Sequence, residues 1–293
     1  MKNWDRWIER FFFDQIQARE LIPFRLAAGT LSILWLLLAI PTWTRDYGAS
    51  GILGYGHEFS GRGVWIWSFL DPIFAVTPVW IPWLLMMLFS ALFVTGRWTR
   101  TMAALLWIFH TIFLFRNVIS SNAEQTVMRM LFFYSMFLPL DGKGSAEAWR
   151  WRMPQFHICA VYLISTICKI KTDPAWLSGD TMYYVLINPL WSKFPYPEIV
   201  TVPGVSKLLT WSSLLLEGSF AFLIWTRWKN AVAIAMVCFH ILIALALNHV
   251  AFFSLSVACG CLLFLDKRLM PHAASVIPPA LGKNIVTINR LFG

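Results

Sequence analysis

Long apolar runs, separated by short breaks that contain charged residues, glycine or proline, dominate the pattern of this chain. A helix needs about 20 mostly apolar residues to cross a bilayer, and breaks of this kind end one helix before the next begins. This pattern predicts about eight membrane-spanning helices, near 23–41, 74–95, 102–115, 126–140, 154–170, 206–226, 230–248 and 251–265. The third and fourth runs are short and can also be read as one pair broken around Arg116-Asn117.

The first residues follow a different pattern, because charged and aromatic residues are interleaved there. Six apolar residues of this segment can share one helical face: Trp4, Trp7, Ile8, Phe11, Phe12 and Ile16. An amphipathic helix of this type lies in the membrane interface, and no cleavable signal peptide is visible. The expected organisation is an interfacial helix in 1–20, a transmembrane domain in 21–268 and a cytoplasmic tail in 269–293.

The composition indicates the same class of protein. Hydrophobic residues make up 58% of the chain and charged residues 13%, whereas a soluble domain has about 25% charged residues. The predicted fold is therefore all-α, a polytopic integral membrane helical bundle. The 17 Trp and 24 Phe residues suit aromatic belts at the two interfaces. All five cysteines lie in apolar runs, where a small buried side chain is the default, and no metal site is expected.

The net charge of +9 is best interpreted from the positions of the basic residues along the chain. With a cytoplasmic N-terminus, fifteen Lys and Arg residues fall in cytoplasmic segments and only Arg45, Arg62, Lys193 and Lys207 in outer loops. This positive-inside bias predicts an integral protein of the plasma (inner) membrane with both termini in the cytoplasm. The basic residues are therefore expected to contact the lipid bilayer and not nucleic acid. The loops near 42–73 and 172–205 would then face outward.

Polar residues inside the predicted spans mark candidate functional positions, because an ionisable group at membrane depth must be paired or face a cavity. Glu217 and His240 lie deepest, and both could instead serve as hydrogen-bonded contacts between helices. Arg25, at the inner end of the first span, is expected to snorkel to the cytoplasmic surface. The candidates nearer the outer side are Arg116, Asn117, Glu124, Gln125, Arg129 and Lys169.

Lys169 has two interpretations on physical grounds. Desolvation beside Arg116 and Arg129 would favour its neutral amine, which could act as a general base while the arginines hold an anion. Alternatively, Lys169 and Lys171 simply cap the end of an apolar helix and extend to the outer surface. The residues alone leave both interpretations open.

An ordered set of short motifs runs through the chain. The densest part is Val161-Tyr162, Lys169, Trp176-Leu177-Ser178-Gly179 and Tyr183-Tyr184. Further motifs occur in the same order, namely Phe24-Arg25, Tyr47-Gly48, Arg116-Asn117, Arg129, Phe137-Leu138-Pro139-Leu140, Leu216-Glu217 and Phe239-His240. Each motif is loose alone, but the ordered set resembles the HTTM (horizontally transferred transmembrane) family over roughly residues 20–266. That family includes the vitamin K-dependent gamma-glutamyl carboxylases.

The resemblance implies a quinol site that opens to the extracytoplasmic side. In the carboxylases, the lysine seven residues after the tyrosine of the Val-Tyr motif deprotonates reduced vitamin K, and Lys169 stands at that spacing from Tyr162. The implied cofactor is reduced menaquinone or a vitamin K-type quinol, with O2 and CO2. Where the carboxylases have a histidine in the fourth span, this chain has Gln125 beside Glu124, and either could take the catalytic role. The implied cofactor-binding residues are Arg116, Asn117, Arg129, Tyr162, Trp176, Glu217 and His240.

Besides the missing histidine, two further departures from the carboxylases limit what the resemblance implies. The interval from Lys169 to Trp176 is one residue longer and contains Pro174, and the chain ends where the carboxylases begin a large lumenal domain. The expected function is modification or maturation of a secreted peptide or protein by a gamma-carboxylase-like lyase activity, with an accessory subunit. The alternatives are a non-catalytic scaffold subunit of a maturation or redox complex, and a transporter or lipid-handling protein.

Overall fold

The computed structural model describes residues 3–52, 76–117, 123–194 and 197–266, and helices dominate this part of the chain. The short N-terminal elements are α1 (Asn3–Phe13), β1 (Gln15–Gln17) and the 3-10 helix η1 (Ala18–Leu21). The longer helices are α2 (Ile22–Ala39), α5 (Trp80–Thr95), α6 (Thr99–Arg116), α7 (Ala123–Ser135), α8 (Ala148–Thr172), α12 (Val205–Leu223), α13 (Lys229–Ala246) and α14 (Ala251–Cys261). The remaining short elements are α3 (Trp43–Tyr47), β2 (Ser145–Glu147), α9 (Ala175–Ser178), α10 (Thr181–Ile187), α11 (Pro197–Val200) and η2 (Leu262–Phe264).

The all-α class is confirmed, and each of the eight predicted ranges overlaps one of the longer helices. Three helical segments of the described chain are long and apolar enough to cross a membrane: Ala18–Ala39, Ala148–Thr172 and Lys229–Ala246. Trp80–Thr95 and Ala251–Phe264 are shorter apolar helices. The number of eight crossings therefore stays a prediction, as does the cytoplasmic tail, since residues 269–293 lie outside the described residues.

Helix ends differ from the predicted ranges where local chemistry overrides the apolar pattern. α7 was expected to reach residue 140 but ends at Ser135, because Pro139 in the following Phe137–Leu140 run has no amide hydrogen to donate and constrains the residue before it. α8 begins at Ala148, earlier than expected, and keeps Pro154 near its start. Six residues at the start of this helix are therefore helical although they carry interfacial Trp and Arg side chains.

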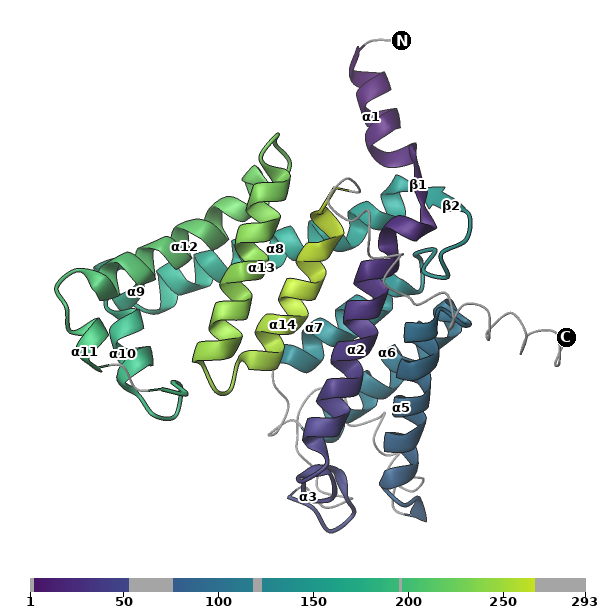
Figure 1. Ribbon diagram of the computed structural model, residues 1–293, viewed down its shortest axis with the longest axis horizontal. Helices are drawn as coiled ribbons and strands as arrows, with labels where there is room; N and C mark the ends of the chain where they lie inside the picture. Colours follow the sequence, from purple (N-terminus) through teal and green to yellow (C-terminus); the bar gives the residue numbers. More distant parts are fainter. Residues whose placement is uncertain (1–2, 53–75, 118–122, 195–196, 267–293) are drawn as a thin grey trace, which may run out of the picture.

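A small antiparallel strand pair was not expected from the sequence. Gln15, Ile16 and Gln17 of β1 pair with Glu147, Ala146 and Ser145 of β2. The predicted interfacial helix of residues 1–20 is accordingly shorter, since α1 ends at Phe13 and the chain then becomes extended. This pairing fixes the N-terminal segment to the start of α8, and α1 projects beyond the bundle (Figure 1).

The helices form two neighbouring groups (Figure 1). In one group α2, α5, α6 and α7 pack in sequence order, and in the other α8 packs on α12 while α13 packs on α14. α14 joins the groups because it also packs on α7 and α2. The short helices α9, α10 and α11 lie at the far end of α8 and α12, away from β2 (Figure 1). This end corresponds to the predicted outer side.

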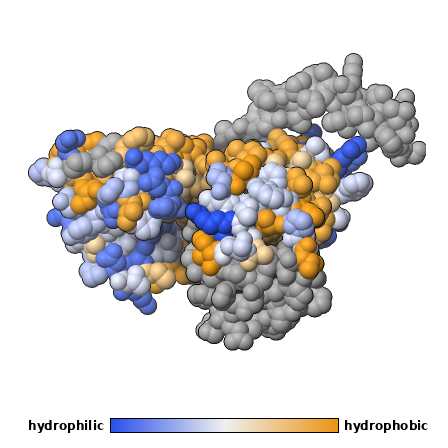
Figure 2. All heavy atoms as spheres, turned by 90° about the horizontal axis from the view of Figure 1, so that it is seen from below, coloured by the Kyte–Doolittle hydropathy of each residue, from blue (hydrophilic) through white to orange (hydrophobic). Residues whose placement is uncertain are grey.

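The packing leaves large apolar side chains on the outside of the bundle. Of the apolar window in Lys229–Ala246, only 22% is buried within the protein, and the exposed residues on this helix include Leu242 and Leu245. A helix that is apolar on its exposed face as well as its packed face is typical of one surrounded by lipid. On the end of the molecule shown in Figure 2, hydrophilic residues are mixed with hydrophobic ones.

Arg25 does not snorkel to the surface as expected. Its residue is 5% exposed, and Nη1 donates a hydrogen bond of 2.6 Å to the carbonyl of Leu140. The segment between α7 and β2 supplies this carbonyl. A buried hydrogen bond from a charged donor thus replaces the solvated position that the sequence predicted.

Candidate functional site

Lys169 and Glu217 form an ion pair between the facing helices α8 and α12. Lys169 Nζ donates to Glu217 Oε1 at 2.6 Å and also contacts Oε2, so the carboxylate is engaged through both oxygens. The side chain of Lys169 is 23% exposed and that of Glu217 is 9% exposed. Lys169 therefore does not extend freely from the helix end. Glu217 thus makes a polar contact between helices, and its partner is a lysine.

Trp176 covers this ion pair from the end of the bundle. Lys169 Nζ lies 4.7 Å from the centroid of the Trp176 ring, within the range of a cation–π contact. The turn between α8 and α9 brings the ring there, because the Asp173 carboxylate accepts a hydrogen bond of 2.9 Å from the Ala175 amide at the start of α9. The inserted Pro174 is accommodated as the residue just before α9.

The Trp-Leu-Ser-Gly turn is fixed to the start of α12. Ser206 Oγ donates to the carbonyl of Gly179 at 3.0 Å and accepts from the Tyr183 amide at 3.0 Å. Trp211 Nε1 donates to the carbonyl of Leu177 at 3.1 Å. α9 and α10 thus rest on the same helix that carries Glu217, and this arrangement fixes Trp176 relative to the ion pair.

A second polar contact lies two helical turns below Lys169 on the same face of α8. Tyr162 is 3% exposed, and its hydroxyl lies 2.7 Å from Nε2 of His240 on α13 and 3.5 Å from Sγ of Cys261 on α14. The Tyr162 ring packs against Phe220 of α12, with 4.5 Å between centroids. Side chains from four helices therefore meet at Tyr162.

Two buried polar atoms near this line have no hydrogen-bond partner among the described residues: Thr166 Oγ1 and His240 Nδ1. Thr166 stands between Tyr162 and Lys169 on α8. α12 approaches closely at this point, because a Cβ added to Gly218 would lie 3.1 Å from Thr166 Cγ2. Unsatisfied buried polar atoms are rare in proteins, so these two atoms are candidate contacts for a ligand with hydroxyl or carbonyl oxygens.

The other predicted residues belong to a separate polar cluster around α3. Asn117 Nδ2 donates to the carbonyl of Asp46 at 2.7 Å, and Arg116 Nη2 lies 3.5 Å from the carbonyl of Gly48. Gln125 Nε2 donates to the hydroxyl of Tyr47 at 2.9 Å. These contacts hold the α3 turn against the ends of α6 and α7. They give Arg116, Asn117 and Gln125 structural roles in this turn.

Two further predicted residues belong to α7. The guanidinium of Arg129 lies 5.7 Å from the centroid of the Phe115 ring on α6. The side chain of Glu124 lies outside the described part of the structure. The structure thus brings together Tyr162, Lys169, Trp176, Glu217 and His240. Arg116 instead contacts the α3 turn, and Arg129 contacts α6. The charged residue beside Lys169 is therefore Glu217 and not the two expected arginines.

Sequence reasoning missed Cys261 and Thr166 as parts of this site. Cys261 was assigned only the role of a buried apolar residue, and it lies 99 positions from the tyrosine whose hydroxyl it contacts. Thr166 carried a usable signal, because it lies on the helical face shared by Tyr162 and Lys169. Spacing along α8 could have identified Thr166, whereas Cys261 required the tertiary structure.

No family model matches the chain, and neither the curated proteins nor the solved structures contain a match to it. The protein class follows from the described part of the fold, which is all-α and has three helices long and apolar enough to span a membrane.

Proposed function

We propose that this protein is a polytopic inner-membrane protein of the HTTM type with a quinol site on its extracytoplasmic side. The Lys169–Glu217 pair beneath Trp176 is the observation that carries the proposal. The two long helices α8 and α12 place opposite charges in contact at a partly buried position, where a purely structural contact between helices would need no charge. Paired ionisable groups at membrane depth are typical of functional positions.

The pair holds the Lys169 amine in a defined position, because Lys169 Nζ lies 2.6 Å from Glu217 Oε1. In the proposed reaction Lys169 is the general base that accepts the proton of a hydroxyl held beside it, and Glu217 is the acceptor of the proton that the ammonium group must first release. When bound, a reduced menaquinone or vitamin K-type quinol supplies such a hydroxyl and the reducing equivalents for reaction with O2.

The residues around the pair fit an aromatic ligand that carries oxygen atoms. Trp176 places an aromatic ring beside Lys169, and Thr166 Oγ1 and His240 Nδ1 are buried without partners among the described residues. Tyr162 orients His240 through the 2.7 Å contact to Nε2. The resemblance to the HTTM family extends the proposal to carboxylation of a secreted peptide with CO2, with an accessory subunit that binds the peptide.

The test is quinol-dependent oxygen uptake by the purified protein in nanodiscs, with reduced menaquinone as the added quinol. The double variant Lys169→Met/Glu217→Gln removes both charges together, so neither partner is left unpaired. We expect uptake by the wild-type protein and its loss in this variant. Lys171→Met is the matched control, because Lys171 is an exposed lysine on the same helix end and its removal should leave uptake unchanged.

Wild-type uptake equal to that of empty nanodiscs, with a normal thermal transition, would contradict the proposal. The scaffold interpretation would then account for the chain better. Uptake that is unaffected by the double variant would assign the reaction to another part of the protein.

A further inference from the structure

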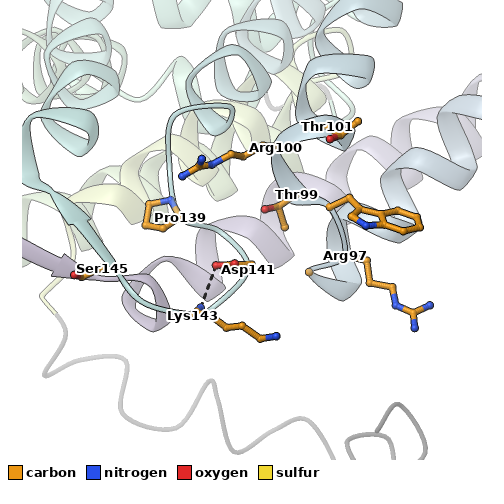
Figure 3. Close-up of a pocket in the computed structure, with 10 residues that line it drawn as sticks. Arg97, Thr99, Arg100, Thr101, Pro139, Asp141, Lys143 and Ser145 are labelled. Atoms are coloured by element: carbon orange, nitrogen blue, oxygen red, sulfur yellow. Dashed lines mark hydrogen bonds between the residues drawn. The ribbon is translucent and has the colours of Figure 1, made fainter. Parts of the chain in front are cut away.

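A second candidate site lies at the opposite end of the bundle from Lys169. A cavity of about 960 Å³ is formed by the turn between α5 and α6 and by the segment from Pro139 to Ser145. This volume falls within the range of about 300–1,000 Å³ found for small-molecule sites. Figure 3 shows Arg100 extending from the first turn of α6 toward Pro139, across from the Asp141–Lys143 loop.

The cavity has a strong excess of positive charge. Three cationic side chains, Arg97, Arg100 and Lys143, line it together with one carboxylate, Asp141. The Asp141 carboxylate accepts a hydrogen bond of 3.0 Å from the Lys143 amide, so it is partly engaged in shaping its own loop. The side chains of Arg100 and Lys143 make no ion pair with any described residue. The lining therefore favours an anion.

A fourth cation stands directly behind the wall. The buried Arg25 has its Nε without a partner among the described residues, and its Nη1 lies 2.5 Å from the point where a Cβ on Gly96 would stand. Gly96 lines the cavity. A side chain at position 96 would displace the guanidinium, so the glycine permits a close approach of Arg25 to the cavity wall.

The neutral groups of the lining suit phosphate oxygens in particular. Thr99 and Thr101 bring hydroxyls to the cavity from the first turn of α6, and the amides of a first helical turn have no acceptor within the helix. Guanidinium groups combined with hydroxyls and helix-terminal amides are a common set of phosphate ligands.

The neighbouring Trp98 indicates that a phosphate group bound in this cavity would belong to a membrane lipid. It lines the cavity, is 72% exposed, and adopts a left-handed backbone with φ of 45°. An exposed tryptophan beside basic residues at the end of apolar helices is typical of the membrane interface. On the predicted topology this is the cytoplasmic leaflet, whose anionic lipids attract basic clusters.

We infer that this cavity binds a phosphate-bearing anion, the headgroup of an anionic phospholipid at the cytoplasmic interface. The inference is independent of the proposed quinol site, because it rests on Arg97, Arg100, Lys143 and Trp98, none of which contacts Lys169.

The test is native mass spectrometry of the protein with phosphatidylglycerol, phosphatidylcholine or inorganic phosphate added. The variant Arg100→Gln/Lys143→Gln removes two charges from the cavity. The control Arg10→Gln/Arg227→Gln removes two exposed charges predicted for the same membrane side but outside the cavity. We expect phosphatidylglycerol to bind in preference to phosphatidylcholine. The cavity variant should lose about thirtyfold in affinity for phosphatidylglycerol, because each of the two removed basic residues contributes about 1 kcal/mol near an anionic lipid surface, while the control retains wild-type affinity.

The phosphate arm distinguishes the sources of the ligand. Binding of inorganic phosphate that depends on Arg100 and Lys143, without preference for phosphatidylglycerol, would support a phosphate site for a soluble ligand and overturn the lipid assignment. Equal losses of phosphatidylglycerol binding in the cavity variant and the control would overturn the site, because nonspecific surface charge would then explain the binding. Thermal transitions of both variants establish that the fold is retained.

Discussion

At the scale of single residues, the contact between Lys169 and Glu217 allows both charged side chains to lie between two packed helices. Glu217 is the more buried partner, with 9% of its side chain exposed against 23% for Lys169. Loss of the lysine would leave a carboxylate in a position where water can reach it only poorly. Removal of one partner is therefore expected to destabilise the protein more than removal of both.

We predict that Lys169→Met destabilises the protein by about 2 kcal/mol, less than the roughly 3–5 kcal/mol of a fully buried pair because Lys169 keeps some solvent contact. Lys169→Met/Glu217→Gln should recover at least half of this loss. Thermal unfolding in one detergent, followed by intrinsic fluorescence, gives the double-mutant cycle. Additive losses in the double variant would mean that the two side chains do not interact.

Arg25 gives a second prediction at this scale, because its buried hydrogen bond contradicts a snorkelling role. Arg25→Met should lose about 1–3 kcal/mol, since the carbonyl of Leu140 would lose a charged donor. Arg19→Met is the matched control, because Arg19 is exposed near the start of the same helical segment. Urea or thermal unfolding of both variants measures the difference. Equal, small effects would restore the snorkelling interpretation.

At the scale of elements, the α9 turn matters because it determines where Trp176 stands. Gly179 ends α9 with a φ of +87°, and a Cβ there would lie 3.0 Å from the backbone Cα of Lys207 on α12. Glycine meets both requirements at once, since a left-handed conformation costs other residues about 1–2 kcal/mol and the neighbouring backbone leaves no room.

We predict that Gly179→Ala destabilises the protein more than Gly204→Ala. Gly204 has a similar φ of +84° but nothing within 4 Å of its added Cβ, so only the backbone cost applies there. Thermal unfolding gives the total effect, and hydrogen exchange of the α9–α10 amides locates it. An equal effect at both positions would show that the contact with Lys207 relaxes without cost.

At the scale of the whole molecule, the two candidate sites lie at opposite ends of the long helix α8. Lys169 is in its last turn, whereas the phosphate-type cavity includes Ser145 in the strand just before its first residue. In the predicted topology the first site faces outward and the second faces the cytoplasm. In this orientation, the quinol would bind on the outer side of the membrane and the lipid headgroup on the cytoplasmic side.

Cysteine labelling tests this orientation. We predict that a membrane-impermeant maleimide labels Glu198→Cys in intact spheroplasts but labels Arg227→Cys only after lysis. The background should carry Cys168→Ser and Cys238→Ser, since both native cysteines are exposed in the structure. Glu198 and Arg227 are themselves exposed, on α11 and on the turn between α12 and α13. The reverse labelling pattern would invert the topology, and equal labelling of both would contradict a membrane crossing by α12.

The sequence by itself determined the helical class and the approximate place of each long helix, because apolar runs and their breakers act locally along the chain. It also selected Lys169, Glu217 and His240 as ionisable residues within apolar spans, and the resemblance to the HTTM family added Tyr162 and Trp176. Only the tertiary structure decided which of them meet. Lys169 and Glu217 lie 48 positions apart, and packing of α8 on α12 brings them into contact. Packing likewise buried Arg25 against Leu140 and directed Arg116 to the α3 turn, since pairing of buried polar groups depends on which helices are neighbours rather than on sequence spacing.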